Sequence, residues 1–499
     1  MELEFQKTAY PCLQKVKWEM QNGEQTQEIR VSDEMPDVGT VLGAWGQVLL
    51  RGKTWKNGEM QVAVGVMAWV LYTPDGGGEP RCVETWIPMQ LRWDLPDTER
   101  DGQILTCCAL RNVDARCISA RKLLVRASVG VLAEAVVPGK MTTYTPGELP
   151  EDVQVLTAAY PMELTAEAGE KPFALEEEVT LPNGAPEMEK PVYYRLCPRI
   201  TDTKVMAGKV VFRGVADLHI LYLASDGRLH SVDTELPFSQ YGELEQDYDQ
   251  DASAQVNCEV TGLEMTRQDN GKWLLKVGLA AQYVISHRPV IRVVEDAYSL
   301  TREAVPARVE VPVTAVLDRT TQTLTTQQTV STDAGRIIDL CMLTDHGVVH
   351  KNDGSADITL PGVCQLLYED PQGQLQCMTT GWEEHWDLPV DGSCKVYPYV
   401  SLAAAPQAVV GAGSVTLRGE LQIDAHTTSG RGVEMVGSLE LGQETLPDPD
   451  RPSLILCRCN DRSLWQIAKE CKTTTAAICR ANGGEETISP DRVLLIPIP

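Results

Sequence analysis

The sequence predicts a mainly β protein of several domains that ends in a small α+β module. Nine Asn-Gly or Asp-Gly pairs interrupt the first 445 residues, and many lie between runs rich in Val, Leu, Thr and Trp. Such pairs between apolar runs are typical of β-hairpins. Long stretches with a helical period are scarce before residue 454, whereas the last 46 residues carry two short helical patterns. A chain of 499 residues is also too long for one hydrophobic core.

The net charge of the chain argues against two classes of partner. The formal charge is −26, and residues 452–499 hold six Lys/Arg and five Asp/Glu, so residues 1–451 carry −27. Binding of nucleic acid or of an anionic membrane surface requires clustered basic residues. We therefore expect neither partner, and interpret the chain as a near-neutral module attached to a strongly acidic body.

The N-terminal residues and the cysteines indicate a cytoplasmic protein. The first residues, MELEFQKTAYPCLQKV, lack the apolar core of a signal peptide, and no apolar run approaches the length of a membrane span. Fifteen cysteines without an export signal are typical of free thiols in a reducing compartment.

One pattern occurs three times in the body. A glycine precedes a strand that ends in Leu-Tyr, and a turn with a second glycine follows four or five residues later. The tyrosines are Tyr72, Tyr222 and Tyr368, the leading glycines are Gly65, Gly214 and Gly362, and the turn glycines are Gly76, Gly227 and Gly373. The common order predicts three copies of one β domain, each a sandwich or a barrel, over residues 1–140, 141–298 and 299–444.

Each predicted copy is far longer than a solenoid repeat, so we expect separate domains rather than a stack. Segments 137–174 and 287–330 are interpreted as linkers or lead-in strands. Residues 445–453 form a linker with three prolines in six residues. Such a linker is extended and semi-rigid, and is expected to hold the C-terminal module away from the body.

The module at 454–499 is predicted to contain a strand, two helices and a second strand. Ser463 and Gln466 form a capping box at the start of the first helix. One buried face of that helix is formed by Leu464, Ile467, Ala468 and Cys471. The second helix carries Ile478 and Ala481 and ends at Asn482-Gly-Gly, and the last strand covers 493–496.

These residues resemble the LysM family. The similarity covers Ser463-Leu-Trp, Ile467-Ala, Asn482, Ile488, Pro490 and the final Leu-Leu-Ile-Pro. Asp461-Arg462 and Asp491 depart from the family pattern in the two loops that line its sugar groove. The resemblance implies a binding site for a partner or a glycan formed by Asp461, Arg462, Ser463, Asn482, Gly483, Ile488 and Pro490. Arg462, in a loop with no evident packing role, is the residue to substitute first.

The body followed by this module resembles the SipL-like SPOCS-domain family of spore-coat morphogenesis proteins. That resemblance implies a non-enzymatic scaffold for assembly of the spore envelope, on the mother-cell side of the forespore. Its partner would be a morphogenetic ATPase or another coat protein, bound through the module and the β domains. The alternative is a protein that binds peptidoglycan or a chitin-like glycan through the LysM module.

Other candidate sites are weaker. The sequence contains no common catalytic signature, so we expect neither enzymatic activity nor a cofactor. Cys457, Cys459, Cys471 and Cys479 match no familiar zinc spacing, and Cys107-Cys108 has no histidine in residues 1–218. We interpret these thiols as buried packing groups, the pair His346 and His350 as coincidental, and the acidic runs at 176–178 and 243–251 as solvated loops.

Overall fold

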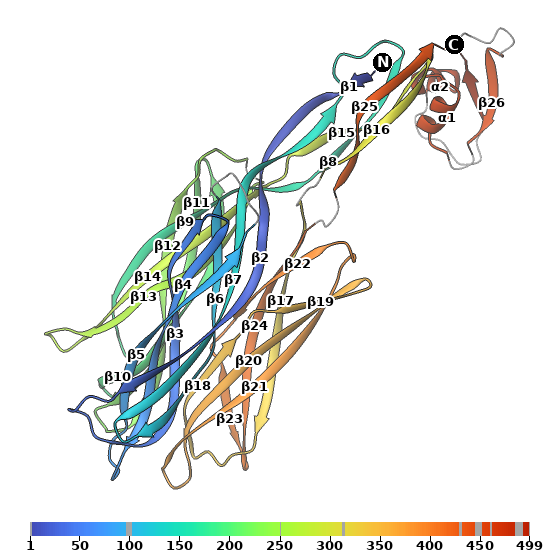
Figure 1. Ribbon diagram of the computed structural model, residues 1–499. Helices are drawn as coiled ribbons and strands as arrows, with labels where there is room; N and C mark the ends of the chain where they lie inside the picture. Colours follow the sequence, from blue (N-terminus) through green and yellow to red (C-terminus); the bar gives the residue numbers. More distant parts are fainter. Residues whose placement is uncertain are drawn as a thin grey trace.

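The computed structural model describes residues 2–95, 102–249, 251–311, 315–428, 432–444, 452–459, 462–484 and 493–498. The molecule is elongated: a broad β body lies at one end, a narrow neck of strands leads away from it, and the C-terminal module lies at the far end (Figure 1). The described residues form 27 strands and two short helices, which confirms the mainly β class. Over these ranges, no helix combines the length and apolarity that a membrane span requires.

The first β unit consists of six strands in two antiparallel sheets. Its strands are β2 (Gln6–Arg30), β3 (Val38–Lys56), β4 (Glu59–Pro74), β5 (Arg81–Asp94), β6 (Gln103–Ser119) and β7 (Lys122–Thr145). One sheet has the order β2-β7-β6 and the other β3-β4-β5. The first and last strands pair from Gln6 opposite Thr145 to Arg30 opposite Lys122. Alternating apolar side chains of β4 and β7 fill the core between the sheets.

The second and third β units have the same order of strands. The second contains β9 (Glu163–Glu178), β10 (Met188–Met206), β11 (Lys209–Ala224), β12 (Leu229–Glu243), β13 (Ser253–Arg267) and β14 (Trp273–His287). Its strands form the sheet β10-β11-β12 and the run β9-β14-β13, which belongs to a seven-stranded sheet shared with the third unit. The third contains β17 (Ala315–Val330), β18 (Arg336–Thr344), β19 (Val348–Asn352), β20 (Ser355–Glu369), β21 (Leu375–Pro389), β22 (Lys395–Leu402), β23 (Gln407–Gly411) and β24 (Ser414–Thr428). Here β24 lies between β17 and the pair β22 and β23, and β20 lies between β21 and the pair β18 and β19.

The three repeated tyrosines occupy equivalent places in these units. Each lies on the central strand of the second sheet, and its hydroxyl bonds to the residue 36 positions earlier. Tyr72 and Tyr222 donate to the carbonyls of Pro36 and Pro186, at 3.0 and 3.3 Å, and Tyr368 accepts from Thr332 at 2.7 Å. The leading glycines are explained by packing, because an aromatic ring of the neighbouring strand occupies the space of a side chain at Gly65, Gly214 and Gly362. The predicted domain boundaries stay predictions.

The units are not independent of one another. The core of the second unit includes Trp45 and Trp69 of the first and Leu367 of the third. Trp45 stacks on Tyr193 with ring centroids 5.1 Å apart. The three units therefore share apolar contacts.

The segments between the units, together with the strand before the first unit and the strand after the third, form the neck. Its strands are β1 (Glu2–Glu4), β8 (Val153–Pro161), β15 (Val290–Ser299), β16 (Arg302–Val311) and β25 (Val433–Glu444). β25 pairs with β1 and β16, and β15 pairs with β8. Phe5, Val294, Val436 and Leu439 fill its own small core. Segments 137–174 and 287–330, interpreted above as linkers or lead-in strands, do provide lead-in strands for the units. They also contribute strands to the neck, which is a fourth β assembly.

Candidate interaction site

The C-terminal module has the predicted order of strand, helix, helix and strand. β26 (Leu454–Arg458) pairs antiparallel with β27 (Val493–Pro497), and α1 (Leu464–Glu470) and α2 (Thr475–Ala481) lie between them in sequence. The capping box is present, because Ser463 Oγ accepts from the Gln466 N–H at 3.2 Å and Gln466 Oε1 accepts from the Ser463 N–H at 2.8 Å. Ile467, Ala468, Ile478, Leu494 and Ile496 form its core.

The described members of the predicted binding site have structural partners of their own. Asn482 donates from Nδ2 to the carbonyls of Ile478 and Leu495, at 2.8 and 2.7 Å, and accepts from the Leu495 N–H at 2.8 Å. It therefore ties α2 to β27. Gly483 is exposed, with φ of +91°. The predicted site residues Asp461, Ile488 and Pro490 lie outside the described residues.

Arg462 has a packing role, contrary to expectation. Its Nη1 lies 2.6 Å from Glu470 Oε2 on α1. Its Nη2 donates to the Arg458 carbonyl at 2.7 Å and to Cys457 Sγ at 3.2 Å. The guanidinium thus connects the β26–α1 loop to the helix, and a substitution at Arg462 tests the stability of the module as well as its binding.

The module packs against the neck, whereas most of the predicted linker, residues 445–451, lies outside the described residues. The carboxylate of Asp296 on β15 accepts from Trp465 Nε1 at 2.8 Å and from Lys469 Nζ at 2.7 and 2.8 Å. Burial acts to raise the pKa of Asp296, but the hydrogen bonds from Lys469 and Trp465 hold it below its usual value. One carboxylate therefore fixes the side of α1 that carries Trp465.

A tyrosine completes this contact. Tyr298, two residues after Asp296 on β15, donates to the Thr473 carbonyl at 2.6 Å and meets the Trp465 ring edge to face, with centroids 4.9 Å apart. Lys472 Nζ donates to the Arg302 carbonyl at 3.2 Å. The contacts of Asp296 and Tyr298 are called the dock below. They have no signal in the sequence, because Asp296 and Trp465 are separated by 169 positions.

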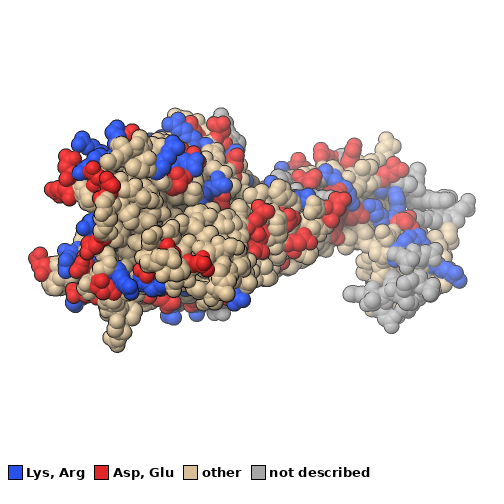
Figure 2. All heavy atoms as spheres, turned by 90° about the horizontal axis from the view of Figure 1, so that it is seen from below, with Lys and Arg blue, Asp and Glu red and all other residues tan. Residues whose placement is uncertain are grey.

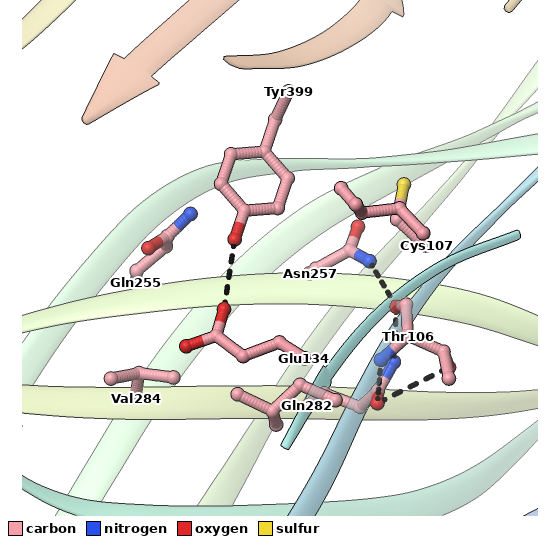
Figure 3. A pocket seen from close by; sticks show the side chains of 10 residues that line it. Thr106, Cys107, Glu134, Gln255, Asn257, Gln282, Val284 and Tyr399 are labelled. Carbon is pink, nitrogen blue, oxygen red and sulfur yellow. Dashed lines mark hydrogen bonds between the residues drawn. The ribbon is translucent and has the colours of Figure 1, made fainter. Parts of the chain in front are cut away.

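A second candidate site lies in the body, where all three units meet. A cavity of about 40 Å³ is lined by Glu134 of the first unit, Asn257 and Gln282 of the second and Tyr399 of the third. The Tyr399 hydroxyl donates to Glu134 Oε2 at 3.2 Å, and Gln282 Nε2 donates to the Thr106 carbonyl at 2.8 Å (Figure 3). The first of these hydrogen bonds links the third unit to the first, and the second links the second unit to the first.

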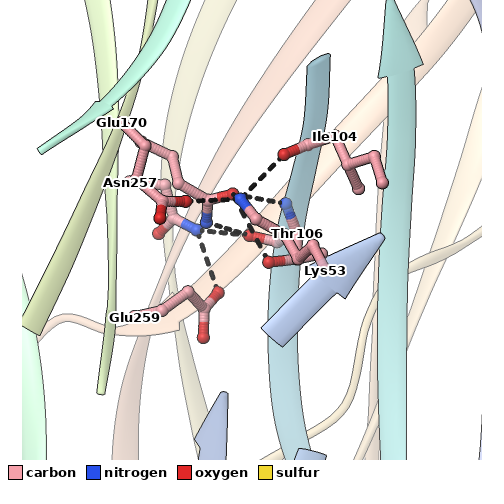
Figure 4. A network of polar contacts seen from close by, with 7 residues as sticks. Lys53, Ile104, Thr106, Glu170, Asn257 and Glu259 are labelled. Atoms are coloured by element: carbon pink, nitrogen blue, oxygen red, sulfur yellow. Dashed lines mark hydrogen bonds and ion pairs between the residues drawn. The ribbon is translucent and has the colours of Figure 1, made fainter. Parts of the chain in front are cut away.

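The polar network beside this cavity contains a lysine and two glutamates. Lys53 Nζ donates to the Ile104 carbonyl at 2.8 Å and to Gln282 Oε1 at 2.7 Å, and pairs with Glu170 (Figure 4). Glu259 accepts from the Cys108 N–H at 3.1 Å and from Asn257 Nδ2 at 3.2 Å. Burial raises the pKa of Glu259 to about 7.

Another buried cluster joins the second unit to the third. Asp339 Oδ2 accepts from the Tyr193 hydroxyl at 2.7 Å, and Asp339 Oδ1 lies 2.7 Å from His219 Nε2. The other ring nitrogen of His219 lies 2.7 Å from Asp233. Burial opposes a charge on His219, but the two aspartates raise its pKa to about 9. The cluster therefore holds a charged histidine at neutral pH.

Cys107 and Cys108 have the buried surroundings that the sequence predicted, whereas the contact of His346 was not predicted. Burial raises the pKa values of the Cys107 and Cys108 thiols, which opposes a nucleophilic role. His346 of the third unit nevertheless reaches the first unit, with Nε2 3.3 Å from the Gly130 carbonyl, whereas His350 is exposed on β19. Among the described residues, no three His, Cys, Asp or Glu side chains are grouped as metal ligands would be.

Charges of both signs are interspersed over the body and the neck on the face shown in Figure 2. Glu176 and Glu178 lie on β9, where they pair with Lys276 and Lys272. The run at 176–178 is thus part of a strand rather than a loop.

A comparison with known protein families gives a match to part of the chain. Residues 187–267, which cover β10 to β13 of the second unit, match the family model described as SipL, SPOCS domain. This match supports the SPOCS-like part of the expected resemblance and points to a sporulation-related role in protein interaction. Neither the curated proteins nor the solved structures give a match.

Proposed function

We propose that this protein is a non-enzymatic scaffold of spore-envelope assembly, with three SPOCS-like domains and a LysM module that binds a coat protein. The observation that carries the proposal is the SPOCS match over residues 187–267. The same strand order in the first and third units supports an extension of that assignment to all three units.

The position of the module supports its role as the binding head. It lies at the end of the neck, away from the broad body (Figure 1). The dock covers the α1 side that carries Trp465, whereas Gly483 and Ser463 are exposed. A head in one orientation loses less entropy on binding than a freely tethered one. Several weak sites on one chain also gain avidity at a polymerised surface.

The partner in this proposal is a morphogenetic ATPase of the coat basement layer, and the site of action is the mother-cell side of the forespore. To test it, the full-length protein is immobilised and titrated with that ATPase, purified, and separately with purified peptidoglycan. We expect saturable binding of the ATPase and no retention on peptidoglycan.

Two variants probe the loops in this assay. Gly483→Asn adds a side chain at an exposed residue with positive φ, a conformation that asparagine tolerates, and no atom of the described residues lies within 4 Å of an added Cβ. Arg462→Ala removes the predicted contact residue. We expect each to weaken ATPase binding at least tenfold, and Arg480→Ala, an exposed arginine on α2, to change it less than twofold.

Melting curves establish that the variants are folded. Unchanged ATPase binding by Gly483→Asn would overturn the role of these loops. Peptidoglycan retention that Gly483→Asn abolishes would establish the glycan-binding alternative instead. In sporulating cells, a fluorescent fusion is expected to form a ring around the forespore, and a diffuse signal throughout sporulation would contradict the proposed location.

A further inference from the structure

A groove between the first and third units is lined by lysines. Its volume is about 380 Å³, within the range of ligand-binding clefts. β2 contributes Lys15, Val16, Lys17 and Trp18, β19 contributes Val349 and Lys351, and β22 contributes Lys395, Val396 and Tyr397. Among the described residues, none of those that line it is acidic. This set is called the lysine groove.

The concentration of lysine here is unusual for the chain. The sequence has 17 lysines and a net charge of −26, yet four of the lysines line this one groove. Between residues 277 and 468 the only lysines are Lys351 and Lys395, and both belong to it. The third unit therefore carries its entire lysine content on one wall of the groove.

The ammonium groups differ in how far they are neutralised. Lys15 lies 2.9 Å from Glu134 Oε1 and 3.8 Å from the centre of the Tyr397 ring, and Lys17 lies 2.7 Å from Glu19. Lys351 donates to the Cys394 carbonyl. Lys395 is exposed and has no ion-pair partner within the described ranges. Two of the four charges, those of Lys351 and Lys395, are thus left without a carboxylate in the part of the chain that the structure describes.

The backbone around the groove is suited to an extended ligand. β2 lies at an edge of the sheet β2-β7-β6, β22 lies at an edge beside β24, and β19 pairs only with β20. Edge strands present backbone donors and acceptors to which another strand can bind. β2 has a register shift between Lys15 and Lys17, so these two side chains do not follow the simple alternation of a strand. A ligand with several acidic side chains complements the lysines of this groove.

We propose that the lysine groove binds an extended acidic segment of a partner protein, one that carries several Asp or Glu residues. The net charge of the chain opposes the approach of a long polyanion, whereas a short acidic segment interacts within about 8 Å, the screening length at physiological salt. Trp18 and Tyr397 add apolar surface beside the charges. This site is distinct from the C-terminal module, so its failure would leave the proposed function untouched.

The test uses the full chain and a fluorescein-labelled decapeptide of alternating Glu and Thr, with a Gln–Thr decapeptide as the neutral comparison. Anisotropy is expected to show binding of the acidic peptide, at least tenfold tighter than that of the Gln peptide and weakened by salt. Lys395→Glu and Lys17→Glu are each expected to weaken it at least tenfold. Lys7→Glu, the same charge change on an exposed residue of β2 outside the groove, is expected to have less than a twofold effect.

Lysines on edge strands also prevent unwanted strand pairing, and the assay separates this role from binding. Equal affinity for the two peptides, or equal losses in Lys395→Glu and Lys7→Glu, would overturn the proposal. Melting temperatures of all variants establish that each binding result comes from folded protein.

Discussion

The contacts inside the body and the contacts of the C-terminal module differ in kind. In the body, the three units share an apolar core and enclose polar clusters around Asp339 and Glu259. At the tip, the module meets the neck through the dock, in which one carboxylate accepts from two side chains. The body is thus built to act as one piece, whereas the head is attached by a few contacts that can be removed singly. The four predictions below test this difference.

Removal of Asp339 should have the largest effect. Asp339→Ala leaves His219 without its buried partner, and we expect the free energy of unfolding to fall by about 3–5 kcal/mol. Urea unfolding measures this loss. Asp233→Ala is the control, because Asp233 pairs with the same histidine but its side chain is 63% exposed, and a loss below about 1 kcal/mol is expected. Similar losses for both variants would mean that the cluster does not join the units.

The second prediction concerns pH. Because the folded pKa of Glu259, about 7, exceeds the usual value, the folded state holds a proton that the unfolded state releases from about pH 4.5 upwards. Stability should therefore fall as the pH rises towards 7 and stay lower above it.

Glu259→Gln removes this cost, so its stability relative to the wild type should rise by up to about 3 kcal/mol between pH 5 and pH 8. Unfolding at several pH values measures the change. Glu264→Gln, an exposed residue on the same strand, should show no such trend. A pH-independent difference for Glu259→Gln would contradict the buried, protonated carboxyl.

Loss of the dock should have a smaller and local effect. Asp296→Ala removes the acceptor of Trp465 and Lys469, and we expect the dock to weaken by about 2 kcal/mol without a change in the body. Small-angle scattering and hydrogen exchange would report a mobile module. Arg292→Ala, at an exposed position of β15, serves as the control. Global unfolding in Asp296→Ala would show that head and body are not separable.

The smallest effect is expected inside the module itself. Ser463→Ala removes the N-cap of α1 and should destabilise the module by about 1 kcal/mol. Hydrogen exchange should accelerate in α1 and remain unchanged in the three units. Faster exchange in the three units of the body would contradict the prediction that a change in the module has only a local effect.

Much of the local structure could be predicted because its signals are local. Turn pairs indicated hairpins, the spacing of Tyr72, Tyr222 and Tyr368 indicated equivalent strands, and the capping box at Ser463 lies where the first helix begins. The site could be predicted only in part. Arg462 was expected to be free, but its contacts with Glu470 and the Arg458 carbonyl depend on how α1 returns towards β26.

The amino-acid sequence by itself determined the β class, the repeated strand pattern and the order of elements in the C-terminal module, because each depends on residues only a few positions apart. The tertiary structure alone decided the neck, the dock and the lysine groove. Their parts come from distant segments: Asp296 meets Trp465, and Lys15 lies beside Tyr397. Periodicity cannot report such contacts, since they depend on how whole sheets pack.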